Sequence, residues 1–299
     1  MATERILVEI PGGAERKVDV LVAGPPEGLP LVFHNGTPGG LVPFEPLTAA
    51  AAARGLRVVT LARPGYERST VWPGRTVADA VGDVGPVLDA LGADSFLTAG
   101  WSGGGPHALA TAARFRGRCL AAAIIAGVAP YQADGLDWMA GMGPENIEEF
   151  GAAERGEIEL TGYLEDEAAA LRSVEGQDVA EALGGLVSDA DKAVLTGDYA
   201  DYLAASLRAA VRDSVAGWRD DDLAFVRDWG FALGQTGPVA VWQGDQDRMV
   251  PYAHGAWLAK HVPGARVHLL RGDGHLTLGV AGLDRILDDL LDLAGLTGW

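Results

Sequence analysis

Short apolar runs alternate with helical segments along the first 130 residues of the chain. Residues 4–10 and 17–23 alternate apolar and polar side chains, which predicts two strands at an antiparallel edge of a sheet. Continuous apolar runs predict further strands at residues 31–33, 56–61 and 120–128 and from residue 97, and helical spacing predicts helices at 46–54, 77–91 and beyond 103. Uninterrupted apolar strands separated by helices indicate an α/β fold, with a mostly parallel central sheet and helices on both faces.

The alternation stops at Tyr131 and resumes at residue 238. Between these points lies helical sequence, with the clearest amphipathic helix at 199–216 and two or three shorter helices over 145–183. The later pattern predicts strands at 238–242 and 265–270 and helices at 254–261 and 282–293. We therefore expect an α/β core of residues 1–130 and 236–299, interrupted by a helical cap at 131–235.

The charge is strongly negative and unevenly distributed. The formal net charge is −18, and residues 131–230 hold 23 acidic but only 7 basic side chains. Nucleic acids and anionic membranes bind positive surfaces, so the charge argues against both, and a small-molecule substrate is the expected partner. Two interpretations of the acidic cap stay open: it favours neutral or cationic substrates at its entrance, or it is a solvated surface.

The remaining composition bounds the location of the protein and its cofactors. The N-terminus lacks a basic segment followed by a long apolar one, so no signal peptide is expected, and the apolar run at 120–130 is too short to span a bilayer. The single cysteine, Cys119, is expected to be a buried structural thiol, and the protein is expected to be cytoplasmic. His254, His261 and His268 have no acidic partners at metal-ligand spacing, so neither a metal nor another cofactor is expected.

A glycine-rich turn around one serine carries the first candidate for catalysis. Residues 100–104 read Gly-Trp-Ser-Gly-Gly and fit Gly-x-Ser-x-Gly, in which a strand reverses sharply into a helix and exposes the serine hydroxyl. A serine hydroxyl is a weak nucleophile unless a base removes its proton and an acid orients that base. Ser102 as nucleophile therefore predicts a histidine and a carboxylate further along the chain, with His107 packed beneath the site.

Both partners follow late strands. Asp245 and Asp247 come after the strand that ends at Trp242, and His275 comes after the strand that ends at Leu270. Open parallel sheets place their sites at the carboxyl ends of the strands, so we expect these side chains to meet Ser102. Either aspartate is a candidate for the acid.

With these segments the chain resembles the α/β-hydrolase superfamily, in particular its lidded serine hydrolases. The loop at residues 34–40 is similar to the family's His-Gly-x-Pro oxyanion loop, and residues 63–66 are similar to its Arg-Pro-Gly-Tyr turn. The resemblance implies Asp247 as the acid, with Asp245 as the alternative, and His275 as the base. It also implies an oxyanion hole made by the backbone N–H groups of Gly103 and Thr37.

The chain departs from the family pattern at two positions. Asn35 separates His34 from Gly36, and Glu67 stands where the family often has glycine. The candidate pocket residues each have a structural alternative: loop support for His34 and Asn35, packing beneath the nucleophile for Trp101, and the cap's own core for Trp138 and Met142.

The resemblance implies a serine hydrolase that cleaves a carboxylic ester of a small or medium, largely neutral substrate through an acyl-enzyme on Ser102. Amide hydrolysis of the proline iminopeptidase type, in which cap carboxylates bind a substrate ammonium, is one alternative. Carbon-carbon bond hydrolysis and perhydrolysis use the same three residues. A ligand-binding receptor that keeps the hydrolase fold is a further alternative. The natural substrate and the oligomeric state stay open.

Overall fold

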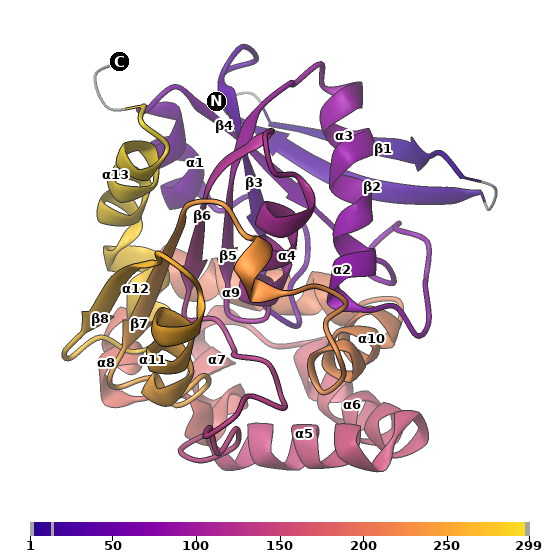
Figure 1. Cartoon of the computed structure of the whole chain (residues 1–299). Helices are drawn as coiled ribbons and strands as arrows, with labels where there is room; N and C mark the ends of the chain where they lie inside the picture. Colours follow the sequence, from indigo (N-terminus) through magenta and orange to yellow (C-terminus); the bar gives the residue numbers. More distant parts are fainter. Residues whose placement is uncertain (1–2, 13–14, 297–299) are drawn as a thin grey trace.

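A single eight-stranded sheet forms the centre of the computed structural model, which describes residues 3–12 and 15–296 (Figure 1). The strands lie in the order β1-β2-β4-β3-β5-β6-β7-β8. Their bounds are β1 Thr3–Ile10, β2 Arg16–Ala23, β3 Leu29–His34, β4 Leu56–Leu61, β5 Phe96–Trp101, β6 Cys119–Ile125, β7 Val239–Gly244 and β8 Arg266–Leu270. β2 pairs antiparallel with both β1 and β4, and every other pairing is parallel, which confirms the predicted fold class.

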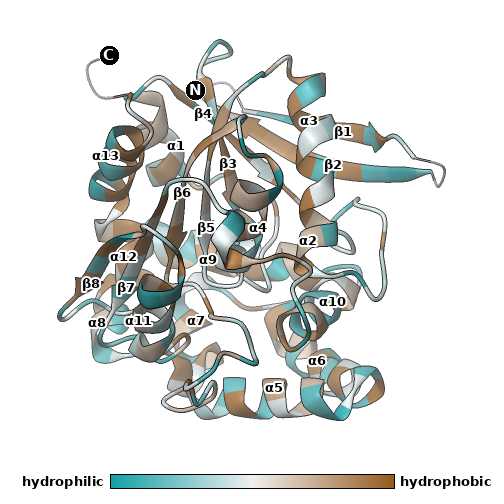
Figure 2. Ribbon diagram, viewed as in Figure 1, coloured by the Kyte–Doolittle hydropathy of each residue, from teal (hydrophilic) through white to brown (hydrophobic). Residues whose placement is uncertain are grey.

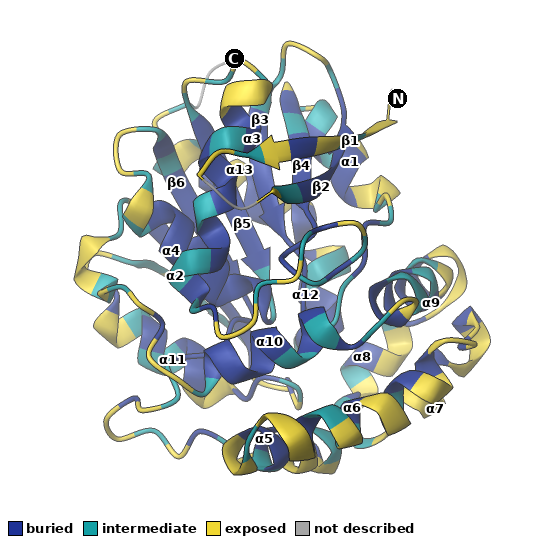
Figure 3. Ribbon diagram, turned by 90° about the vertical axis from the view of Figure 1, so that its right-hand side faces the viewer, coloured by how far each residue is buried: buried dark blue, intermediate teal, exposed yellow. Residues whose placement is uncertain are grey.

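Helices cover both faces of the sheet. One face packs against α1 (Glu45–Ala52) and α13 (Leu283–Leu293), and the other against α3 (Val84–Ala90), α4 (Gly104–Arg114) and α11 (Tyr252–His261). Neighbouring strand residues point to opposite faces: Ile124 packs on the side of α3, α4 and α11, and Ile125 packs on the side of α1 and α13. Figure 2 shows hydrophobic residues concentrated on the strands, and Figure 3 shows that the central strands are buried, whereas much of β1 is exposed.

The segment between β6 and β7 contains helices and no strand. Its helices are α5 Pro144–Arg155, α6 Glu157–Leu171, α7 Val179–Ala182, α8 Asp189–Val194, α9 Gly197–Val211 and α10 Ala216–Phe225. Their apolar faces form a cluster of their own, which also takes in Tyr66 and Leu276 from the rest of the chain. We call residues 131–235 the cap segment, after its predicted boundaries; the outer sides of α5 and α6 are exposed (Figure 3).

Several elements differ from the prediction in their limits. The predicted helix at 77–91 is broken into α2 (Val77–Ala80), a 3-10 turn at Val81–Asp83, and α3. Pro86 lacks the N–H that a continuous helix needs at this point. The strand predicted at 120–128 ends at Ile125, because Ala126 adopts a positive φ of 49°. A helix that was not predicted, α12 (His275–Ala281), follows β8.

Two further expectations concern burial and membranes. Cys119 is buried, and burial raises the pKa of its thiol to about 12, so the thiol stays protonated at neutral pH. No helix in residues 3–12 and 15–296 is long and apolar enough to cross a membrane. Short 3-10 turns complete the described elements, at Gly176–Asp178, Gly184–Leu186 and Leu233–Gln235.

Candidate active site

Ser102 occupies a sharp turn between β5 and α4. β5 ends at Trp101 and α4 begins at Gly104, so only two residues separate strand from helix. Ser102 takes the left-handed conformation, with φ of 57°, which non-glycine residues rarely adopt. Its N–H donates to the Ile125 carbonyl at 2.8 Å, and its own carbonyl accepts from the Gly105 N–H at 2.8 Å. These bonds hold the strained backbone and leave the side chain at the edge of a cavity.

The glycines on either side of the serine are required by space. A Cβ on Gly100 would collide with the Gly104 carbonyl oxygen, and a Cβ on Gly104 would collide with the His34 carbonyl oxygen. The Gly-x-Ser-x-Gly pattern therefore reflects close backbone contact between β5, α4 and the loop that follows β3.

His275 and Asp247 are in direct contact. The Nδ1 atom of His275 lies 2.8 Å from Oδ2 of Asp247, and both side chains are buried. The other oxygen of Asp247 accepts from the backbone N–H groups of Met249 at 2.9 Å and Val250 at 2.8 Å. Gln243 Nε2 also donates to Oδ2 at 3.0 Å. These contacts hold Asp247 in one orientation, in which Oδ2 can accept a hydrogen bond from the Nδ1–H group of His275.

Asp245 lies elsewhere. Its side chain is exposed and accepts from the backbone N–H of Gly272 at 2.8 Å and from Gln246 Nε2 at 2.9 Å. The Gln246 amide and the Gly272 N–H lower the pKa of Asp245. The geometry therefore pairs His275 with Asp247 rather than with its neighbour.

The main chain of His275 is anchored as firmly as its ring. Trp101 Nε1 donates to the His275 carbonyl at 3.2 Å, and the two rings lie 5.1 Å apart. His275 is the first residue of α12, and its backbone N–H donates to Asp191 Oδ2 at 3.1 Å. His275, Trp101 and Ser102 all line the same cavity.

The two residues proposed from the family resemblance as backbone donors lie side by side. A Cβ on Gly103 would collide with Thr37 Oγ1. Gly36, which precedes Thr37, packs against the nucleophile, since a Cβ there would lie 3.4 Å from Ser102 Cβ. In the described part of the chain, neither the Thr37 N–H nor the Gly103 N–H has a hydrogen-bond acceptor. Both groups are therefore free to bind a ligand oxygen.

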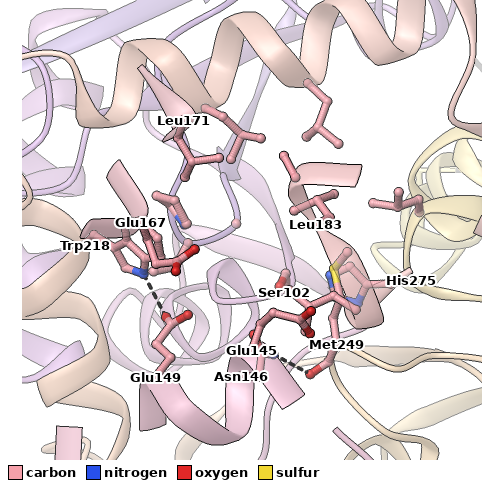
Figure 4. A pocket seen from close by; sticks show the side chains of 18 of the residues that line it. Ser102, Glu145, Asn146, Glu149, Glu167, Leu171, Leu183, Trp218, Met249 and His275 are labelled. Atoms are coloured by element: carbon pink, nitrogen blue, oxygen red, sulfur yellow. Dashed lines mark hydrogen bonds between the residues drawn. The ribbon is translucent and has the colours of Figure 1, made fainter. Parts of the chain in front are cut away.

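The cavity beside Ser102 is roofed by the cap segment. Apolar side chains from α6, α9 and their connections form much of its wall, among them Leu171, Leu183 and Leu203. Glu145, Glu149 and Glu167 also line it, together with Asn146, Tyr163, Trp218 and Met249. Figure 4 shows Glu149 and Glu167 beside Trp218 on one side of the cavity and His275 on the other. The described lining contains no arginine or lysine, so the cavity is electronegative.

Burial affects the ionisation of these carboxyls. Glu149 accepts from Trp218 Nε1 at 2.8 Å, and burial raises the pKa of Glu149 to about 7. Asp222 lies fully buried beside Glu149, and burial raises its pKa well above the usual range. The pKa of Glu167 is raised for the same reason. The cavity therefore becomes more negative as the pH rises through neutrality.

Four of the five candidate pocket residues lie away from the cavity. His34 Nε2 contacts Thr111 Oγ1 at 3.0 Å beneath α4, and Asn35 Nδ2 donates to the Gly40 carbonyl at 2.9 Å. Both support the loop, which corrects their assignment to the pocket; Gly36 and Thr37 line the cavity instead. Trp138 and Met142 belong to a buried apolar cluster and do not line the cavity, so their assignment to the pocket is corrected as well. Trp101 does line the cavity.

His107 is packed beneath the site as predicted, and three further histidines pack against other parts of the chain. His107 is fully buried beneath the turn, its Nδ1 lies 2.9 Å from the Gly103 carbonyl, and burial lowers its pKa to about 3. His254 is buried between the Ala129 N–H and the Trp138 carbonyl, whereas His261 stacks on Trp257 and His268 on Trp242. Residues 3–12 and 15–296 contain no group of side chains that could hold a metal ion.

The backbone conformation at Glu67 explains why glycine is favoured at this position. Glu67 has a φ of 51°, the left-handed conformation for which glycine is favoured. Its side chain offsets the strain by accepting from the Leu41 N–H at 3.0 Å and from Arg5 at 2.7 Å.

Two aspartates of the cap segment contact the site and were not predicted from the sequence. Asp191 reaches α12, and Asp221 reaches the loop of Thr37. The run of three aspartates at 220–222, set between Trp218 and Leu223, was a usable signal, because a buried helix face rarely carries adjacent acids. No comparable signal marks Asp191.

Comparisons with known proteins agree with this architecture. A family profile described as the alpha/beta hydrolase fold matches residues 30–281. The bromoperoxidase from Bacillus anthracis is 22% identical, with a TM-score of 0.73 over 97% of this chain and 100% of that one. The enol-lactonase from Burkholderia xenovorans LB400 is 20% identical, with a TM-score of 0.65 over 93% of this chain and 97% of that one.

An esterase from Exiguobacterium antarcticum is 16% identical, with a TM-score of 0.68 over 97% of this chain and 98% of that one. No curated protein matches the chain. Identities this low show a shared fold and not a shared substrate. Because the family profile spans most of its length, the chain belongs to the alpha/beta hydrolase fold family.

Proposed function

We propose that the protein is a serine hydrolase that cleaves a carboxylic ester through an acyl-enzyme on Ser102. The observation that carries this proposal is the 2.8 Å contact between His275 Nδ1 and Asp247 at the cavity that Ser102 lines. A carboxylate on Nδ1 fixes the tautomer whose Nε2 is free to accept a proton. The strained turn that holds Ser102 supports the same role.

In the proposed reaction, Ser102 Oγ attacks the acyl carbonyl and His275 Nε2 takes the hydroxyl proton. The N–H groups of Gly103 and Thr37 bind the oxyanion of the tetrahedral intermediate, and such a donor typically stabilises the transition state by about 3 kcal/mol. The C–O bond to the alcohol then breaks, and His275 returns the proton to the leaving oxygen. Water, activated by His275, attacks the acyl-enzyme and releases the acid and free Ser102.

Substitution of Ser102 tests this function. We expect Ser102→Ala to remain folded but to hydrolyse p-nitrophenyl acetate no faster than the background. Ser95→Ala is the matched control, because Ser95 precedes β5 and so lies at its opposite end. Activity in the Ser102→Ala protein comparable to that of the control would refute the proposed nucleophile.

A second candidate, amide hydrolysis next to a free amine, is favoured by the carboxylates in the cavity. Glu145, Glu149 and Glu167 offer negative charge with the rings of Tyr163 and Trp218, a combination that suits an ammonium group. Turnover of an aminoacyl p-nitroanilide, compared with its N-acetylated form, separates the two candidates. An amidase of this kind turns over only the free amine, whereas an esterase leaves both anilides intact.

A further inference from the structure

A buried aspartate of the cap segment contacts the loop that carries Thr37. Asp221 lies in α10 and has no exposed surface. The hydroxyl of Thr37 donates to Asp221 Oδ2 at 3.0 Å, and the Tyr66 hydroxyl donates to the same oxygen at 3.1 Å. The same helix ends at Phe225, whose ring packs against Gly103. One cap helix therefore contacts both residues to which we assign the oxyanion donors.

A buried arginine links this aspartate to the rest of the loop. Arg63 donates to Asp221 Oδ2 through Nε at 2.8 Å and through Nη2 at 2.5 Å. Its Nη1 donates to the Asn35 carbonyl at 2.7 Å, and its Nη2 donates to the Gly36 carbonyl and to Thr37 Oγ1, each at 2.9 Å. A single guanidinium thus holds three consecutive loop residues, and Asp221 holds the guanidinium.

The charges in this network are fixed. Burial alone would raise the pKa of Asp221, but Arg63 and Arg75 hold it well below its usual range. Arg75 Nη2 donates to Asp221 Oδ1 at 2.6 Å, so each carboxylate oxygen has a cationic partner. Buried ion pairs contribute little net stability, yet they fix the orientation of the groups they contact.

We propose that Asp221 is a positioning residue that aims the Thr37 N–H at the oxyanion, and this rests on the proposed function above. Thr37 Oγ1 accepts from Arg63 and donates to Asp221, so its side chain has one favoured orientation. Thr37 itself lines the cavity, and its side chain lies against Gly103. Asp221 of the cap segment accordingly positions part of the proposed oxyanion hole, while other residues of the segment roof the cavity.

Three variants test the proposal. Thr37→Val removes the hydroxyl that Asp221 and Arg63 hold but keeps the backbone N–H, and Thr37→Ser restores the hydroxyl. Asp221→Asn removes the charge of the aspartate. We expect Thr37→Val and Asp221→Asn to lower kcat for p-nitrophenyl acetate at least about tenfold with KM changed less than about threefold, because misaligned donors stabilise the transition state less. Thr37→Ser should recover most of kcat.

Asp220→Asn is the matched control. Asp220 is the next residue of α10, is also buried, and pairs with Arg219 without contact to the loop. It carries the same change of charge, so we expect kcat within about twofold of the parent protein.

Binding of a transition-state analogue separates positioning from a general loss of folded enzyme. An alkyl trifluoromethyl ketone adds to Ser102: the Oγ–C bond forms, the proton passes to His275, and the former carbonyl oxygen becomes the oxyanion. We expect its inhibition constant to rise by the factor by which kcat/KM falls in Thr37→Val and Asp221→Asn. A smaller fraction of active protein lowers kcat but leaves the inhibition constant unchanged.

Parental kcat and inhibition constant in Thr37→Val would overturn the proposal, whatever Asp221→Asn does. A fall in kcat without a change in the inhibition constant would overturn it as well. The proposed function fails separately, if Ser102→Ala keeps its activity. If Ser102→Ala is inactive while the Thr37 and Asp221 variants behave like the parent, only the positioning role is lost.

Discussion

Asp191 of the cap segment caps the helix that begins with His275. Its carboxylate accepts from the backbone N–H groups of His275 at 3.1 Å, Leu276 at 2.7 Å and Thr277 at 3.2 Å. The first N–H groups of a helix have no partner within it, and a carboxylate there also interacts favourably with the helix dipole. The short helix α12 therefore depends on a residue that lies 84 positions earlier in the chain.

Removal of this cap is expected to lower both stability and activity. Asp191 is fully buried, so Asp191→Ala leaves three N–H groups without an acceptor; we expect a loss of about 2 kcal/mol in the free energy of unfolding. A displaced α12 also moves His275, so kcat should fall. Urea unfolding and ester hydrolysis measure the two effects. Asp189→Ala is the control, since Asp189 lies on α8 with Asp191 but has a fully exposed side chain. Equal losses in both variants would contradict the capping role of Asp191.

The two candidate acids are distinguished by their asparagine variants. Asp247 Oδ1 accepts two backbone N–H groups, so the oxygen of an asparagine stays on that side and its NH₂ faces His275. The amide would then hold the tautomer with its proton on Nε2, which cannot accept the proton of Ser102. We expect Asp247→Asn to lower kcat/KM by on the order of 10³ to 10⁴. Asp245→Asn should change it less than about threefold; a larger loss in Asp245→Asn would reverse the assignment.

The raised pKa of Glu149 predicts that stability falls as the pH rises. Between its usual value of 4.5 and about 7, the folded carboxyl binds more proton than the unfolded one. This contribution is complete below about pH 4.5 and is lost as the pH passes 7, and Asp222 acts in the same direction. As the pH rises from 4.5 to 8, the free energy of unfolding of Glu149→Gln should increase relative to that of the parent protein by up to about 3 kcal/mol. Urea unfolding at both pH values checks this, and a constant difference would exclude Glu149 as the titrating group.

The cavity carboxylates predict a preference for positive charge. A p-nitrophenyl ester with an ammonium group should be hydrolysed with a higher kcat/KM than its uncharged isostere, and Glu167→Gln should reduce that ratio about fivefold. Glu159→Gln is the control, because Glu159 is an exposed residue of the same helix. High salt should reduce the effect of any long-range steering. If the ratio of kcat/KM for the charged ester to that for the uncharged one is the same in all three proteins, the acidic residues of the cap do not select the substrate and form only a solvated surface.

The alternation of strands and helices predicted the sheet because burial on both faces leaves a pattern visible in each segment. The grouping of Ser102, Asp247 and His275 could also be predicted from local patterns. Each residue follows an apolar strand, and the carboxyl ends of parallel strands lie at the same edge of the sheet. The helix α12 was not predicted: it is short, contains Gly279, and is stabilised by Asp191 rather than by its own residues. Contacts between distant segments leave no periodic signal.

The pocket shows the same limit. His34 and Asn35 lie within three positions of Thr37 in the sequence, yet their side chains are buried in the protein, and Gly36 and Thr37 line the cavity instead. The cavity carboxylates of α5 and α6 looked like any solvated helical charge in the sequence. Only the packing of the cap segment over Ser102 distinguishes Glu149 from its exposed neighbour Glu148.

Mass spectrometry of the trapped acyl-enzyme tests the central claim most directly. The protein is mixed with excess p-nitrophenyl acetate, quenched in acid within the first turnover, and digested. The account predicts one acetyl group on the peptide that contains Ser102, together with a burst of p-nitrophenol, and neither in Ser102→Ala. Acetylation at another residue, or rapid hydrolysis by the Ser102→Ala protein, would contradict it.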